Sequence, residues 1–151
     1  MGTSFYLQRG SDEENRLHVC RRSGASWKFQ GVYPSSDFVV RMGRNTGVYY
    51  FADEFRDFLP EEVVAITSVA DWLYVLENLP EGVVLVDDNE SGESAKELVE
   101  EIMSLSPEPL DEVLAREYVF QDEGLRAISR SLAQDDFVDS RGWRFTYRKF
   151  S

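Results

Sequence analysis

The sequence contains very few of the residues that cross-link small proteins, bind metals or take part in catalysis. It has one cysteine, Cys20, and one histidine, His18. A lone cysteine excludes an intramolecular disulfide and fits a reducing compartment. No second histidine completes a zinc set with Cys20, and His-based acid–base catalysis would rest on His18 alone. Alternation places both side chains on one strand face, where they lean apart. We interpret His18 as a partly exposed histidine flanked by arginines.

Long hydrophobic runs are also missing. The first residues contain no apolar signal-peptide core, and no apolar stretch approaches the roughly 20 residues of a membrane-spanning helix. We therefore expect a cytoplasmic protein that does not contact a membrane. With 151 residues the chain has the size of one domain and can bury a core without a metal or a disulfide, so we predict a single domain over 1–151.

The net charge of −12 is unevenly distributed. Residues 1–51 carry 7 Arg and Lys against 4 Asp and Glu, which gives +3. Residues 52–140 carry 5 against 24, which gives −19, and residues 141–151 carry 4 against none, which gives +4. The chain is thus basic at both ends and strongly acidic in the middle. A field of this strength exceeds what solubility requires and would speed association with a basic partner.

Alternating apolar and polar residues dominate the first third of the chain and predict an antiparallel meander. The expected strands are 3–9, 16–22, 27–30, 38–42 and 48–51, the last two pairing as a hairpin across 43–47.

The middle of the chain changes to helical spacing and short apolar runs. It predicts a short helix over 53–59, a strand over 63–67, a helix after the capping box of Ser68 and Asp71, a strand over 83–86 and a helix after the capping box of Ser94 and Glu97. The run at 83–86 is apolar on both faces, which is typical of a strand covered on both sides, so we expect it to be the central strand. This order predicts a βαβα unit with parallel strands and a right-handed crossover.

The last third predicts a helix beginning at 110–112, a second one over 125–132, and a terminal strand over 143–150. The terminal strand places Trp143, Phe145 and Tyr147 on one face and should return to the N-terminal sheet. The predicted fold is therefore α+β: an N-terminal antiparallel meander joined by a C-terminal strand, with a central βαβα unit and helices packed on the sheet.

The acidic centre suggests a non-enzymatic domain that docks on a basic protein, as immunity proteins, antitoxins and phage inhibitors do. This is an analogy from charge and size. The residues expected to bind such a partner are Asp87, Asp88, Glu90, Glu93, Glu97, Glu100, Glu101, Asp111 and Glu112.

A first alternative is a nucleic-acid face on the basic, aromatic-rich strands. Its candidate residues are Arg16, Arg22, Lys28, Arg144 and Arg148. The net charge of −12 opposes this reading, and we favour pairing of these cations with the chain's own acidic helices.

A second alternative is a metal-dependent enzyme that uses Asp87 and Asp88, at the end of an apolar strand. The glycine-flanked stretch 43–47 lacks the Lys-Ser/Thr of a phosphate-binding loop. We therefore interpret the two aspartates as turn formers, and we predict no catalytic residue, metal or cofactor.

Overall fold

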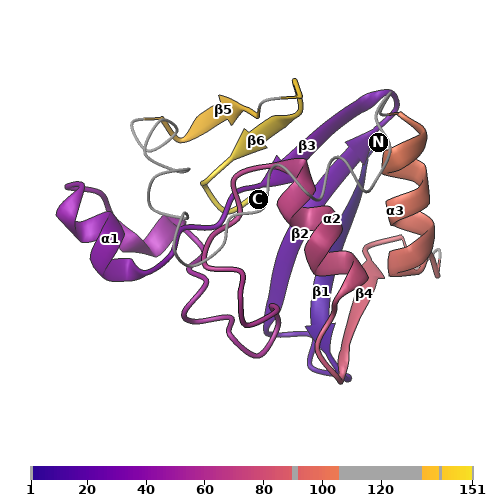
Figure 1. Cartoon of the computed structure of the whole chain (residues 1–151), viewed down its shortest axis with the longest axis horizontal. Helices are drawn as coiled ribbons and strands as arrows, with labels where there is room; N and C mark the ends of the chain where they lie inside the picture. Colours follow the sequence, from indigo (N-terminus) through magenta and orange to yellow (C-terminus); the bar gives the residue numbers. More distant parts are fainter. Residues whose placement is uncertain (1, 90–91, 106–133, 140, 151) are drawn as a thin grey trace.

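One mixed sheet organises the part of the chain that the computed structural model describes, residues 2–89, 92–105, 134–139 and 141–150 (Figure 1). Its strands are β1 (Thr3–Arg9), β2 (Arg16–Ser23), β3 (Ser26–Gln30), β4 (Val83–Asp87), β5 (Asp136–Val138) and β6 (Arg144–Thr146), in the order β4-β1-β2-β3-β6-β5. The helices are α1 (Ser36–Arg41), α2 (Val69–Glu77) and α3 (Ala95–Ser104), with a short 3-10 helix, η1 (Thr46–Val48). The fold is α+β, as predicted.

Strands β1, β2 and β3 form the predicted antiparallel meander. The register between β1 and β2 shifts at Phe5 and Tyr6, which pair with Cys20 and His18 and so bypass Val19. A bulge of this kind interrupts the alternation of side chains. Val19 and Cys20 consequently both enter the core, and the expectation that Cys20 shares a face with His18 is wrong.

The C-terminal strand returns to the N-terminal sheet, as predicted. Strand β6 pairs in parallel with β3, with Phe145 opposite Phe29, and antiparallel with β5. Phe145 and Tyr147 are fully buried. Gly31 lies so close to this segment that a Cβ there would approach Tyr147 Cδ1 to 2.7 Å. Strand β5 was not predicted.

The predicted hairpin over 38–42 and 48–51 is wrong, because its first half is helix α1 and its second half contains η1. Ser35 caps α1 by accepting a hydrogen bond from Phe38 N at 3.2 Å. Asp37 lies in the first turn and Arg41 in the last, which suits the helix dipole. Capping and end charges therefore outweigh the strand preference of the paired valines.

The region between η1 and α2 also differs from the prediction. Residues 52–58 form successive turns instead of a helix. Residues 63–67 form no strand, and Ile66 makes only an isolated antiparallel bridge with Val32, with both N–O distances at 3.0 Å. Helices α2 and α3 are confirmed, each beginning with a capping box.

The predicted βαβα unit with parallel strands is wrong. Strand β4 runs antiparallel to β1 and lies at one edge of the sheet, so it is not the central strand. Val84 is 46% exposed, which shows that this apolar run is not covered on both faces. The helices predicted around 110 and 125–132 lie outside the described residues.

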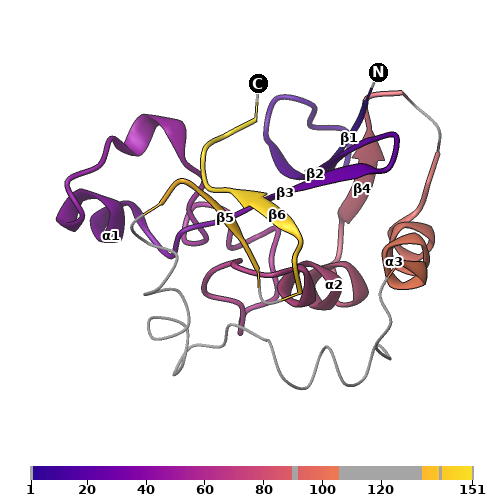
Figure 2. The ribbon, with the colours of Figure 1, turned by 90° about the horizontal axis from the view of Figure 1, so that it is seen from above.

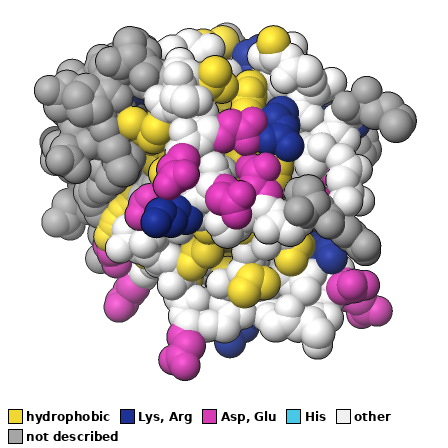
Figure 3. Space-filling model, turned by 90° about the vertical axis from the view of Figure 1, so that its right-hand side faces the viewer, with side chains coloured by type: hydrophobic (Ala, Val, Ile, Leu, Met, Phe, Trp, Pro, Cys, Tyr) yellow, Lys and Arg dark blue, Asp and Glu magenta, His cyan; other side chains and the backbone are white. Residues whose placement is uncertain are grey.

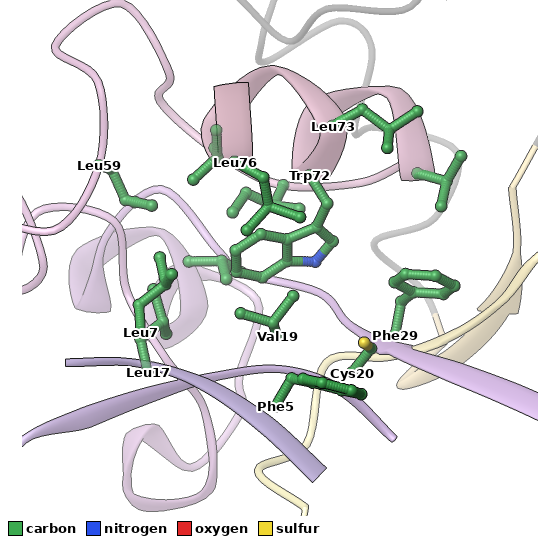
Figure 4. Packing of buried hydrophobic residues seen from close by; sticks show 14 of the residues in the cluster. Phe5, Leu7, Leu17, Val19, Cys20, Phe29, Leu59, Trp72, Leu73 and Leu76 are labelled. Carbon is green, nitrogen blue, oxygen red and sulfur yellow. The ribbon is translucent and has the colours of Figure 1, made fainter. Parts of the chain in front are cut away.

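Helices α2 and α3 cover one face of the sheet, and the C-terminal residues leave on the other side (Figure 2). Trp72 of α2 lies over Val19, with Phe29, Leu76 and Cys20 nearby (Figure 4). Its Nε1 donates a 2.7 Å hydrogen bond to the Gln30 carbonyl, which joins helix and sheet within the core.

Candidate functional site

The described members of the predicted acidic set lie on β4, on α3 and on the loop between them. Acidic side chains gather on this face of the molecule, interspersed with apolar side chains and with some Lys or Arg (Figure 3). Asp88, Glu97 and Glu100 are exposed, whereas Asp87 is buried. Glu90, Asp111 and Glu112 lie outside the described residues.

Asp87 and Asp88 shape the end of β4. Asp87 Oδ1 accepts a hydrogen bond from Asn89 N at 3.0 Å, and Asp88 Oδ1 accepts one from Ser4 N at 3.0 Å. These are the bonds of a turn and of a strand terminus, as the turn-former interpretation anticipates. Within the described ranges, no three His, Cys, Asp or Glu side chains gather closely enough to hold a metal ion.

Arg22 forms ion pairs with two of the acids expected to bind a partner. Its Nη1 lies 3.4 Å from Glu93 Oε1 and 2.5 Å from Glu101 Oε2. The guanidinium also lies over the rings of Phe5 and Trp27, at 5.1 and 5.8 Å from their centroids. Arg22 therefore ties α3 and its preceding loop to β2. This internal pair agrees with the expectation of self-pairing for Arg22.

The carboxylates that share Arg22 are close enough to influence each other. Partial burial and the nearby charge of Glu101 raise the pKa of Glu93, and the charge of Arg22 opposes this rise. A carboxyl with a raised pKa accepts a proton at a higher pH than an ordinary glutamate does. Glu93 and Glu101 are thus held in a structural ion cluster, which leaves Glu97 and Glu100 as the outward acids of α3.

Replacing Arg22 with alanine should lower the free energy of unfolding by about 2 kcal/mol at pH 7. This lies between the values for exposed pairs and for fully buried pairs, because the three side chains are partly exposed. The loss should shrink in acid, because the raised pKa of Glu93 lets this carboxyl take up a proton and lose its ion pair with Arg22. Urea unfolding at neutral and at acidic pH measures it. Arg21→Ala, at the exposed neighbouring position, is the control and should cost under about 0.5 kcal/mol.

A groove of about 880 Å³ runs along the outer edge of β4 toward the start of α3. Leu79, Leu85 and Ala95 contribute apolar surface. Acidic residues outnumber the one cation, Arg16, and include Asp87, Asp88 and Glu93. The charge pattern of the sequence indicates the acids but not the groove. The only signal of the groove is the apolar run at 83–86, which predicts a buried strand because composition does not distinguish an edge strand from a central one.

The cations expected to form one nucleic-acid face are divided by the fold. Arg22 lies on the helix-covered face, whereas Lys28 and Arg144 are register neighbours on β3 and β6. Arg16 lies on β2, where it donates to Gln8 Oε1 at 2.7 Å and lies over the Tyr6 ring. Arg148 pairs with Asp135 at 2.9 Å. The five cations therefore do not form one surface.

His18 is 2% exposed, so the expectation of a partly exposed histidine is wrong. Its ring stacks on Tyr6 at 4.6 Å and meets the edge of Phe150 at 4.2 Å. Burial lowers the pKa of His18 to about 4, and burial also raises the pKa of the Cys20 thiol. A neutral imidazole and a buried thiol are packing groups, and neither is placed for nucleophilic chemistry.

The chain shows no significant match to a protein-family model, a curated protein or a solved structure. None of the helices among the described residues has the length and apolar character needed to cross a membrane.

Proposed function

We propose that this protein is a non-enzymatic binding domain whose α3–β4 face docks on a basic protein. The proposal rests on one observation. The exposed acids Asp88, Glu97 and Glu100 lie on the same face of the molecule as a groove whose charged residues are mostly acids (Figure 3). A face with an excess of one charge sign attracts a partner of the opposite sign and speeds the encounter. The apolar surface in the groove supplies contact area that charge alone lacks.

The partner class follows from this chemistry. Proteins that carry dense positive charge include nucleases and other nucleic-acid-binding proteins, so a nuclease toxin or a nucleic-acid-binding protein fits the face. The domain would then act as an immunity protein, an antitoxin or an inhibitor. The single cysteine supports a cytoplasmic setting.

Charge removal on α3 tests the proposal. The variant Glu97→Gln/Glu100→Lys changes the charge by +3, and glutamine at 97 can still complete the capping box with Ser94. Glu101→Lys is avoided because Glu101 pairs with Arg22. The matched control, Asp53→Asn/Glu54→Lys, makes the same charge change at exposed positions outside the groove.

We expect the wild-type protein to capture a basic protein from its host lysate, and surface plasmon resonance with that protein to give a salt-dependent association rate. The α3 variant should associate roughly tenfold more slowly at low salt, and the control within about twofold of wild type. The difference should shrink as salt shortens the screening length to about 8 Å at physiological strength. An association rate that changes neither with these substitutions nor with salt would contradict the proposal.

A second candidate function uses the helix-free face of the sheet. Arg21, Lys28 and Arg144 are register neighbours across β2, β3 and β6, which places three cations in a row. Such a row can follow a single-stranded nucleic acid. Fluorescence anisotropy with a labelled oligothymidine tests it. Binding that Lys28→Glu/Arg144→Glu removes and Glu97→Gln/Glu100→Lys leaves intact would favour this function.

A further inference from the structure

The outer edge of β4 offers backbone groups for pairing. Gly10 N donates to the Gly82 carbonyl at 2.9 Å, and Asp88 N donates to the Ser4 carbonyl at 3.1 Å. Hydrogen-bonded pairs alternate along an antiparallel ladder, so Val84 and Val86 also direct their peptide groups to β1. Leu85 therefore directs its N–H and carbonyl away from the sheet. Among the described residues, no hydrogen bond reaches these two groups.

Strand β4 also has few of the devices that shield an exposed edge, and its one charged residue is Asp87 at the carboxyl end. Proteins usually place proline, lysine or a bulge on such a strand. The five residues of β4 include neither proline nor lysine, and its register with β1 contains no shift. The strand presents Val84 at 46% exposure instead. An open edge with an apolar side chain is a ready acceptor for another strand.

The groove beside this edge has room for the side chains of an added strand. Residues that project on the same side as Leu85 would meet Leu79 and Ala95, and residues that project on the opposite side would meet Val84 and Val86. At about 3.3 Å per residue, the five residues of β4 can pair over roughly 17 Å. The exposed carboxylate of Asp88 at the end of the groove favours lysine or arginine on the incoming segment.

We propose that β4 accepts an extended segment of the basic partner as an additional strand, with apolar side chains in the groove and cationic side chains against the exposed Asp88. The inference rests on the proposed docking function and adds how the partner is held. Main-chain bonds to Leu85 supply affinity, and the alternating side chains supply selectivity.

A second copy of this chain fits the same edge poorly. Two β4 strands paired edge to edge would bring together two chains that each carry a net charge of −12. A net charge far from zero disfavours association of like copies. The charge of the chain thus favours a basic partner over self-association.

Amide hydrogen exchange provides the direct test, with a capped nine-residue peptide of alternating lysine and valine as the probe at low salt. In the free protein the Leu85 amide should exchange much faster than that of Val86, which faces β1. Saturating peptide should slow exchange at Leu85 by roughly tenfold or more. Peptide binding without this protection, absence of binding, or a dimer of the free protein paired through β4 in sedimentation would overturn the inference.

Two variants at the same position isolate the backbone contribution. Leu85→Pro removes the outward N–H without removing a ladder bond to β1, whereas Leu85→Ala shortens the side chain and keeps the N–H. The peptide should bind roughly tenfold more weakly to the proline variant than to the alanine variant, and equal affinities would contradict strand addition. If Leu85→Pro does not fold, the exchange experiment on the wild-type protein decides.

The two proposals fail in different ways. Suppose the peptide protects Leu85, but the association rate of the captured protein does not change with the Glu97→Gln/Glu100→Lys substitutions or with salt. The proposed acidic docking function is then wrong, and the proposal that β4 accepts a strand is retained. If the captured protein depends on charge while neither it nor the peptide protects Leu85, the docking function stands and strand addition is wrong.

Discussion

Deleting residues 143–151 is expected to leave a chain without a cooperative unfolding transition. The deletion removes β6, which lies between β3 and β5, together with the fully buried rings of Phe145 and Tyr147. Removing one buried aromatic side chain costs about 3–5 kcal/mol, and two such losses match the total stability of many domains. Urea unfolding followed by tryptophan fluorescence measures the effect.

Point variants separate this loss from a general effect of truncation. Phe145→Ala alone should lower the free energy of unfolding by about 3–5 kcal/mol, because the ring stacks on Phe29 and Phe137. Arg144→Ala changes the preceding, exposed position and should cost under about 0.5 kcal/mol. A truncated chain that unfolds cooperatively at the wild-type urea midpoint would show that β6 does not support the sheet.

Acidification should destabilise the protein through His18. Burial lowers the pKa of His18 to about 4 from the ordinary value of 6.5, so the unfolded chain binds the proton more tightly than the folded one. Stability from this group is therefore complete above pH 6.5 and is lost as pH falls toward 4. Between pH 7.5 and pH 4.5 the loss should reach about 2.5 kcal/mol, at about 1.4 kcal/mol per pKa unit.

Replacing His18 with phenylalanine isolates this contribution from that of the carboxylates. The new ring can keep the contacts with Tyr6 and Phe150 but cannot take up a proton. The difference in unfolding free energy between variant and wild type should therefore shift by about 2.5 kcal/mol in favour of the variant from pH 7.5 to pH 4.5. A difference that stays constant over this range would show that His18 does not titrate between the two states. The charges of Arg21 and Asp88 act on His18 in opposite directions and remain in both proteins.

Local signals predicted the elements that depend on local interactions. The capping boxes at Ser68 and Ser94 locate α2 and α3, and the alternation around Phe145 locates a strand with the correct buried face. Helix α1 was missed although its signals were present: Ser35 as the cap and Gly43 after the end, at a φ of 75°. The valine pair at 39–40 favours a strand, but these end signals outweigh that preference.

The remaining differences come from contacts between distant residues, which a pattern in one stretch does not contain. The run at 83–86 has the composition of a central strand, but β1 offers it only an antiparallel edge position. His18 is buried because Phe150, 132 positions later in the sequence, covers its ring. The acids of the candidate site were found by charge, but their division into structural and outward groups depends on where Arg22 points.

The parallel pairing of β3 with β6 has a consequence for how the protein folds. Lys28 pairs with Arg144, so closing this part of the sheet joins segments 116 positions apart, whereas β1, β2 and β3 are connected by short turns. Contacts between such distant segments form late, because the loop entropy is lost before the contact stabilises the chain.

During synthesis and refolding, the edge of β3 that faces β6 therefore remains unpaired longer than any other edge within the meander. Trp27 and Phe29 project from that strand into the core, so the partly folded intermediate exposes aromatic surface beside unpaired peptide groups. Intermediates of this kind aggregate or recruit chaperones. We expect refolding yield to fall with protein concentration far more steeply than the stability of the finished fold would suggest.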